Sequence, residues 1–278
     1  MPSYDSSRAR FRLADRHMAV FAHLVDGETP VDELWESLTE LQAIGLVGEE
    51  GELAPVLAPL LTTMANPMLL LTVEVTGAHG TLNHGIMVGQ DDVIAHEGWP
   101  GEEESEYVPI DATTIIWELA RMVHLMRGDA EDFEVASIET TMGVLDAAFS
   151  ALDEAQNDEE KAIELTRKAL IETGGLKESE AIALSDLVLS MNSMWRITSV
   201  WDGNHEGERS AMVRALAVWD CGPRGYWVRE KPEEPILEGQ VGPDSALKLV
   251  RVSPGRVWER ITNLLPDKNE LAEPVPAP

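Results

Sequence analysis

Histidines and carboxylates gather in one short stretch of the chain, where a metal ion could in principle be held. The stretch contains His79, His84, His96, Asp91, Asp92 and Glu97. Imidazole and carboxylate groups are zinc ligands, but the spacing here matches no zinc motif. Two of the histidines stand beside Gly80 and Gly85, which is typical of a solvated loop. We therefore expect solvated loop histidines, with no metal and no cofactor.

Cys221 is the only cysteine, so the chain cannot form an intramolecular disulfide, which fits a reducing cytoplasm. It lies in the turn-like sequence "DCGPRG". A nucleophilic thiol needs a partner base, and the nearest histidine along the chain is His205. We favour an ordinary turn cysteine. Because no nucleophile, base and orienting group converge and no phosphate-binding loop is present, we expect no enzyme and no catalytic residue.

The sequence "VWDCGPRGYWV" around this cysteine indicates a hairpin rich in aromatic side chains. Rings that flank a solvent-exposed turn are typical of partner-binding hot spots, and nearby arginines could pair with acidic groups of a partner. The candidate partner-binding residues are Trp219, Arg224, Tyr226, Trp227 and Arg229. The competing interpretation is that the rings fill the core beneath the last helix, and the sequence alone does not choose between them.

Hydrophobic periodicity predicts the elements that must position these residues. In the first part we expect helices over 11–25, 31–48 and 53–67, a strand over 68–77, a hairpin that turns at 89–92, a strand that ends near 110 and a helix over about 112–127. In the second part we expect helices over 135–155, 158–175 and 178–191, then strands and a hairpin up to 252, and a closing helix capped by Ser253.

Two phrases of the sequence repeat one another. The phrase "VPIDATTIIWEL" contains Trp117 and Glu118 near its end. The phrase "VSPGRVWERITNLL" contains Trp258 and Glu259, after the same kind of strand and cap. Further matches in the same order are Asn66 with Asn192, Met68 with Met194 and Thr72 with Thr198. The pattern predicts two quasi-symmetric halves that divide near residue 130.

The expected fold class is α/β (α+β), with an antiparallel sheet flanked by helices and a helical bundle over about 131–190. We divide the chain into an N-terminal α/β half, residues 1–130, and a C-terminal half, residues 131–278, within one domain overall. The second half carries the inserted helical hairpin, and its tail "AEPVPAP" is expected to be disordered.

The passage "LTELQAIGLVGEEGELAPVLAPLLTTMANPMLLLTVEV" and the closing "VRVSPGRVWERITNLLP" resemble the EspG proteins of actinobacterial type VII secretion. The likeness covers nearly the whole chain in layout, but its motifs are short and none is catalytic. The resemblance implies a cytosolic chaperone that binds the helical tip of secreted PE/PPE-type heterodimers and keeps them soluble before export. The chain departs from that family in its stronger acidity and in its short opening before the first helix.

The charge balance bears on partners, since 50 acidic residues face 21 basic ones and the net charge is -29. Such a surface repels phosphate backbones and acidic lipid head groups, so we expect neither nucleic-acid binding nor membrane insertion. An acidic proteome would explain the composition equally well. The alternative function is a winged-helix regulator, suggested by "PVDELWESLTELQAIGLVG". Its expected recognition helix carries no Lys or Arg, which argues against contact with phosphates.

Overall fold

The computed structural model describes residues 1–128, 135–155, 158–172, 174–205, 208–230 and 241–271. The chain forms two compact units. Unit 1 comprises Met1–Leu125, Arg196–Ala215 and Ile261–Pro278, and unit 2 comprises Met126–Trp195 and Leu216–Arg260. The predicted disordered tail, 272–278, lies outside the described residues.

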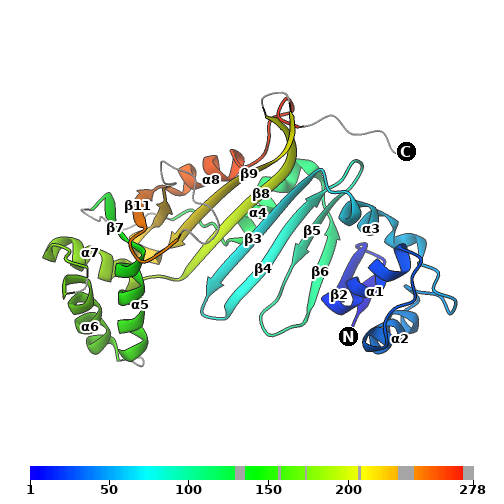
Figure 1. The fold of residues 1–278 in the computed structure, drawn as a ribbon, viewed down its shortest axis with the longest axis horizontal. Helices are drawn as coiled ribbons and strands as arrows, with labels where there is room; N and C mark the ends of the chain where they lie inside the picture. Colours follow the sequence, from blue (N-terminus) through cyan, green and yellow to red (C-terminus); the bar gives the residue numbers. More distant parts are fainter. Residues whose placement is uncertain (129–134, 156–157, 173, 206–207, 231–240, 272–278) are drawn as a thin grey trace. The chain divides into compact units, whose positions relative to one another are not determined.

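The fold is mixed α and β, with an eleven-stranded sheet in the order β1-β2-β6-β5-β4-β3-β8-β9-β10-β11-β7 (Figure 1). The strand registers that are defined residue by residue are antiparallel, for example Leu71 opposite Ile86 and Trp227 opposite Trp219. Strands β8 (Ser193–His205) and β9 (Glu208–Asp220) contribute residues to both units.

Unit 1 begins with β1 and β2 and then three helices, and most of the sheet follows. The elements are β1 (Ser3–Asp5), β2 (Arg10–Ala14), α1 (Asp15–Val25), α2 (Trp35–Ala43), α3 (Ala58–Ala65), β3 (Leu69–Gly77), β4 (Gly80–Val88), β5 (Val93–Glu97), β6 (Glu104–Pro109) and α4 (Ile115–Met122). Short 3-10 turns precede α2, α3 and α4 at Asp32–Leu34, Pro55–Leu57 and Ala112–Thr114. One core cluster joins Phe21, Leu41 and Leu60 of the helices to Phe11 and Ile94 of the strands.

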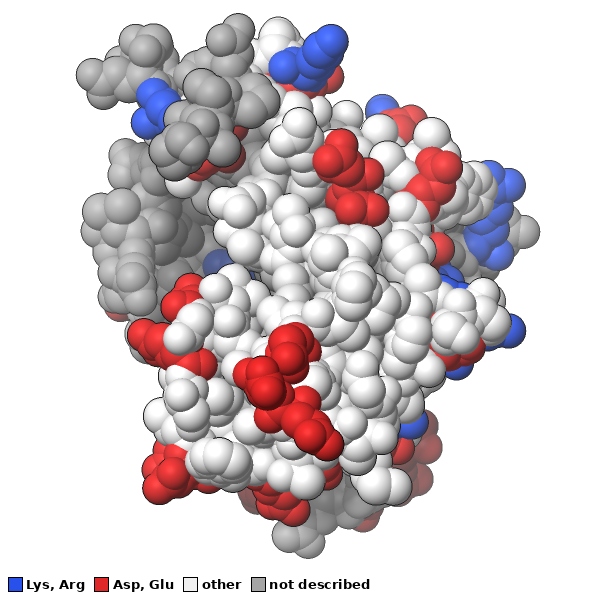
Figure 2. Space-filling view, turned by 90° about the vertical axis from the view of Figure 1, so that its right-hand side faces the viewer, with Lys and Arg blue, Asp and Glu red and all other residues white. Residues whose placement is uncertain are grey.

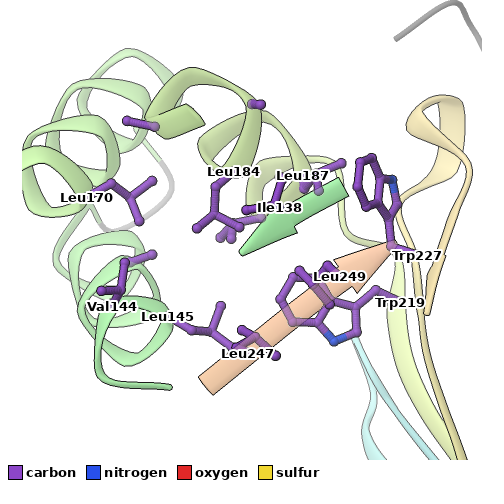
Figure 3. Close-up of a cluster of buried hydrophobic side chains, with 14 of the residues drawn as sticks. Ile138, Val144, Leu145, Leu170, Leu184, Leu187, Trp219, Trp227, Leu247 and Leu249 are labelled. Carbon is purple, nitrogen blue, oxygen red and sulfur yellow. The ribbon is translucent and has the colours of Figure 1, made fainter. Parts of the chain in front are cut away.

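Unit 2 places three helices against a smaller set of strands. It contains β7 (Ser137–Thr141), α5 (Met142–Ala155), α6 (Glu159–Glu172), α7 (Glu178–Leu189), β10 (Tyr226–Arg229), β11 (Ala246–Val252) and most of α8 (Pro254–Thr262). Its core contains Leu145, Leu184, Leu187 and Leu249 together with Trp227 (Figure 3). The predicted helical bundle is therefore confirmed in α5–α7.

Two strands were predicted wrongly as parts of helices. Residues 10–14 form β2, although the helix was expected to begin at Phe11. Residues 137–141 form β7, although they were expected to begin a helix over 135–155. In β2 the side chains of Phe11 and Leu13 are buried while Arg10 and Arg12 are only half-buried, so the period is two rather than 3.6.

Most other predicted elements are confirmed, including the turn between β4 and β5. There the Gly89 N–H donates to the Asp92 carbonyl over 2.8 Å. The Asp111 side chain accepts a hydrogen bond from the Thr113 N–H over 2.8 Å and so caps the 3-10 turn Ala112–Thr114 that leads into α4. Helix α4 is shorter than expected, since it ends at Met122 rather than near residue 127.

The strand order bears on the predicted duplication. Outward from the centre it reads β3-β4-β5-β6-β2 on one side and β8-β9-β10-β11-β7 on the other. A helix follows β6 and another follows β11, as the repeated phrases predict. The two compact units do not coincide with the two predicted halves. Residues 196–215 and 261–271 belong to the predicted second half of the chain but group with unit 1. The duplication into residues 1–130 and 131–278 stays a prediction, which superposition of the two strand series would test.

Candidate partner-binding surfaces

The hairpin formed by β9 and β10 buries its aromatic rings. Trp227 is fully buried, and Trp219 and Tyr226 are 5% and 6% exposed. Trp219 and Trp227 lie opposite one another on neighbouring strands and join the cluster with Leu187 and Leu249 (Figure 3). The solvent exposure expected from the partner-contact interpretation is not found, and the three rings are core residues of unit 2. A role of this hairpin in binding stays a prediction.

Arg224, at the turn of the hairpin, is bound within unit 2. Arg224 forms an ion pair of 3.6 Å with Asp186 of α7, and Asp186 also pairs with Arg167 of α6 over 3.3 Å. The Arg224 carbonyl accepts a hydrogen bond from the Trp227 indole over 3.2 Å. Arg229 is half-buried at the end of β10. This turn therefore contacts the helical bundle through an ion pair as well as through hydrophobic packing.

A cavity of about 650 Å³ lies beside this hairpin in unit 2. Its lining is mixed and includes Asn192, Asp220, Tyr226, Arg251 and Ser253. The Tyr226 hydroxyl oxygen accepts the Met126 N–H over 3.0 Å, and burial raises the pKa of this phenol. The Asp220 carboxylate accepts the Gly222 N–H over 2.9 Å. The described walls thus offer a carboxylate, an amide and a phenol.

A second surface lies on the central strands of unit 1, where one face of the sheet is open. Along β3, Leu69, Leu71, Val73 and Val75 are buried, whereas the alternate residues Thr72, Glu74 and Thr76 are exposed. The exposed positions continue on β4, β8 and β9 with Thr81, Asn83, Arg196, Asp202, Arg209, Ala211, Val213 and Ala215. Val213 is 60% exposed. An antiparallel sheet with one covered face and one open face presents a broad surface to a partner.

Charge pairs lie among the small side chains of this open face. Glu74 and Arg196 approach to 4.0 Å on neighbouring strands, and Arg209 pairs with Asp202 over 2.6 Å. Ala211, Val213 and Ala215 give a short apolar row along β9. Sequence reasoning missed this surface, although the alternation of "LLLTVEVTG" marks the exposed side of β3.

The candidate histidines do not converge. His79 is exposed at the turn between β3 and β4, whereas His84 is buried on β4. His96 pairs with Gly85, so it projects from the opposite face of the sheet to His84, which pairs with Glu97. Among the described residues, no group of three His, Cys, Asp or Glu side chains is placed to hold a metal ion. Sequence reasoning was wrong to treat His84 as a loop residue.

Cys221 is buried, and burial, followed by the charge of Asp220, raises the pKa of its thiol to about 12. The thiol is therefore protonated at neutral pH and is a poor nucleophile. The side chain of His205, its only suggested partner base, lies outside the described residues. No helix in the described part of the chain is long and apolar enough to cross a membrane.

Comparison with known proteins identifies a similar fold but no family that matches by sequence. No family model and no curated protein matches the chain. A solved structure that matches is the Mycobacterium tuberculosis type VII secretion system chaperone EspG5, in complex with the PE25-PPE41 dimer. The match has a TM-score of 0.54 at 10% sequence identity and covers 95% of this chain and 100% of that chain. The chain therefore has an EspG-like fold.

Proposed function

We propose, on the basis of this EspG-like fold, that the protein is a cytoplasmic chaperone that binds a helical PE/PPE-like dimer before type VII secretion. The observation that carries the proposal is the match over the full length of EspG5, whose structure was solved with a PE25-PPE41 dimer. The proposal requires no catalysis, and the buried, protonated thiol of Cys221 supports a binding role over a chemical one.

We further propose that the open sheet face of unit 1 contacts the partner. Helical export substrates have apolar ends that aggregate when they are exposed. The row of Ala211, Val213 and Ala215 offers apolar contact, and the pairs Glu74–Arg196 and Asp202–Arg209 offer a polar surround. An apolar centre with a polar rim is the usual composition of a protein interface.

The acidity of the chain supports a solubilising role. The net charge is -29, and Figure 2 shows groups of acidic side chains on a largely uncharged face, with Lys and Arg mostly at its margins. A complex that carries this charge is repelled by other copies of itself, which opposes aggregation of the bound substrate.

Co-expression with a PE/PPE-like protein pair, followed by size-exclusion chromatography, tests the function. We expect the helical pair to co-elute with the wild-type chain. Failure of any helical pair to co-purify would contradict the chaperone proposal.

Matched variants test the surface. Val213→Asp should abolish co-elution, because it places a charge in the apolar row of β9. Val25→Asp, at a similarly exposed valine at the end of α1, should leave the complex intact (Val213 and Val25 are 60% and 54% exposed). If Arg224→Glu removes the partner while Val213→Asp does not, the contact lies at the hairpin and our choice of the open sheet face is wrong.

A further inference from the structure

A small pocket of about 210 Å³ lies in unit 1, near the residues where β6 ends and β2 begins. Its walls include Phe11 of β2, Leu60 of α3, Ile94 of β5 and Tyr107 of β6, and Asp92 is the one charged residue of the lining. Small-molecule sites usually have about 300–1,000 Å³. This pocket is below that range and is suited to a single side chain.

Two aromatic rings of the pocket lie side by side. Phe11 and Tyr107 are opposite one another on β2 and β6, and both side chains are buried. Burial raises the pKa of Tyr107 to about 12, so its hydroxyl is neutral and can donate or accept a hydrogen bond. The faces of aromatic rings carry partial negative charge and attract organic cations.

Asp92 adds a full negative charge to the lining. Its carbonyl closes the turn with the Gly89 N–H, but its carboxylate makes no ion pair or hydrogen bond with any described residue. Arg10, at the start of β2, is bound to Glu106 over 3.3 Å and lies 3.8 Å from Asp5. The Asp92 carboxylate is thus available to a cation from outside.

We propose that this pocket binds the side chain of a lysine presented by a protein partner. Its four methylene groups would lie against Leu60 and Ile94, and its ammonium group would meet the Asp92 carboxylate and the ring of Tyr107. An anion would be repelled by Asp92. A neutral apolar side chain would cover this carboxylate without pairing it, which costs free energy. A bare metal ion would gain nothing from the apolar walls.

The test uses the isolated full-length chain with labelled methyl groups, titrated with N-acetyl-lysine methylamide and followed by NMR. We expect shifts at Leu60 and Ile94 that saturate, with at least fivefold weaker binding of the norleucine analogue, which lacks the ammonium group. Equal binding of the two amides, or shifts confined to other methyl groups, would overturn the proposal.

Two variants distinguish a specific contact with the Asp92 carboxylate from the overall negative charge of the protein. Asp92→Asn should weaken lysine amide binding about fivefold or more, whereas Asp91→Asn, at the exposed neighbour outside the lining, should change it less than twofold. An unchanged methyl spectrum without ligand shows that each variant is folded. Equal effects of the two variants would contradict the role of Asp92.

A further titration uses the free amine n-pentylammonium, to distinguish a lysine side chain from a small amine as the occupant of the pocket. Comparable affinity for the amine and the lysine amide supports a side chain as occupant. Binding of the free amine alone would overturn that assignment. Because the titrations need no export substrate, their failure leaves the proposed chaperone function standing, and loss of that function leaves the pocket testable.

Discussion

At the scale of single residues, burial decides which side chains can act. The indole of Trp227 is completely buried beside the leucines of unit 2, whereas that of Trp117 on α4 is 64% exposed. Both are large aromatic residues, and the sequence alone does not show which of the two is buried. Their different surroundings make them a matched pair for measuring what burial contributes.

Trp227→Ala should lower the free energy of unfolding by about 3–5 kcal/mol, because it removes a buried ring and leaves a cavity. Trp117→Ala should lower it by less than about 1 kcal/mol, the range of surface substitutions. Urea unfolding followed by circular dichroism measures both. Equal small losses would show that Trp227 is not a core residue.

Histidine burial gives the protein a pH-dependent stability. Burial lowers the pKa of both His84 and His96, although Glu97 opposes the shift in each case. In the unfolded chain these groups have a pKa near 6.5, so as the pH falls through 6.5 the unfolded state binds protons that the folded state does not. Acid therefore favours unfolding.

We expect the free energy of unfolding to decrease between pH 7.5 and pH 6.0, measured in urea at each pH. His84→Gln should reduce this decrease. His79→Gln, at an exposed position, should leave it unchanged. A decrease that is the same in all three proteins would exclude His84 as a source.

At the scale of elements, the sequence predicted the strands and helices that have one clear period. Strand β3, the β4–β5 turn and α7 were all found where the pattern placed them. β2 and β7 were missed because each runs directly into a helix, α1 or α5, with no breaking residue between them. The alternation in β3 marks an exposed side, but neither the extent of the open sheet face nor the choice between a buried and an exposed hairpin could be predicted, since exposure depends on which distant segments cover a strand.

The cap of the 3-10 turn Ala112–Thr114, which leads into α4, is an element-scale test. Asp111 accepts hydrogen bonds from the Thr113 N–H and from its hydroxyl, over 2.8 and 2.6 Å. Asp111→Ala should therefore destabilise the protein by about 1 kcal/mol. Asp111→Asn, which keeps the acceptor oxygen, should recover most of the loss in the same urea experiment. No recovery with Asn would indicate that charge, rather than capping, stabilises this turn.

At the scale of the whole molecule, charge dominates. The net charge of -29 makes the folded chain repel itself, and salt screens this repulsion over about 10 Å at 0.1 M. The melting temperature should therefore rise when NaCl is increased from about 10 to 300 mM. A fall would mean that attractive ion pairs, such as Arg121 with Glu97, outweigh the repulsion.

The passage of β8 and β9 through both units has a consequence for synthesis. Strand β3 needs β8 as its neighbour, and β8 leaves the ribosome only after the whole of α5–α7. Until then, the nascent first 125 residues carry an unpaired β3 edge, which is a template for aggregation. Unit 1 is finished last of all, when the chain beyond Ile261 arrives and Arg214 binds Glu270 and the Leu265 carbonyl. A ribosome-bound chaperone that shields β3 during this interval is therefore expected to raise the yield of folded protein.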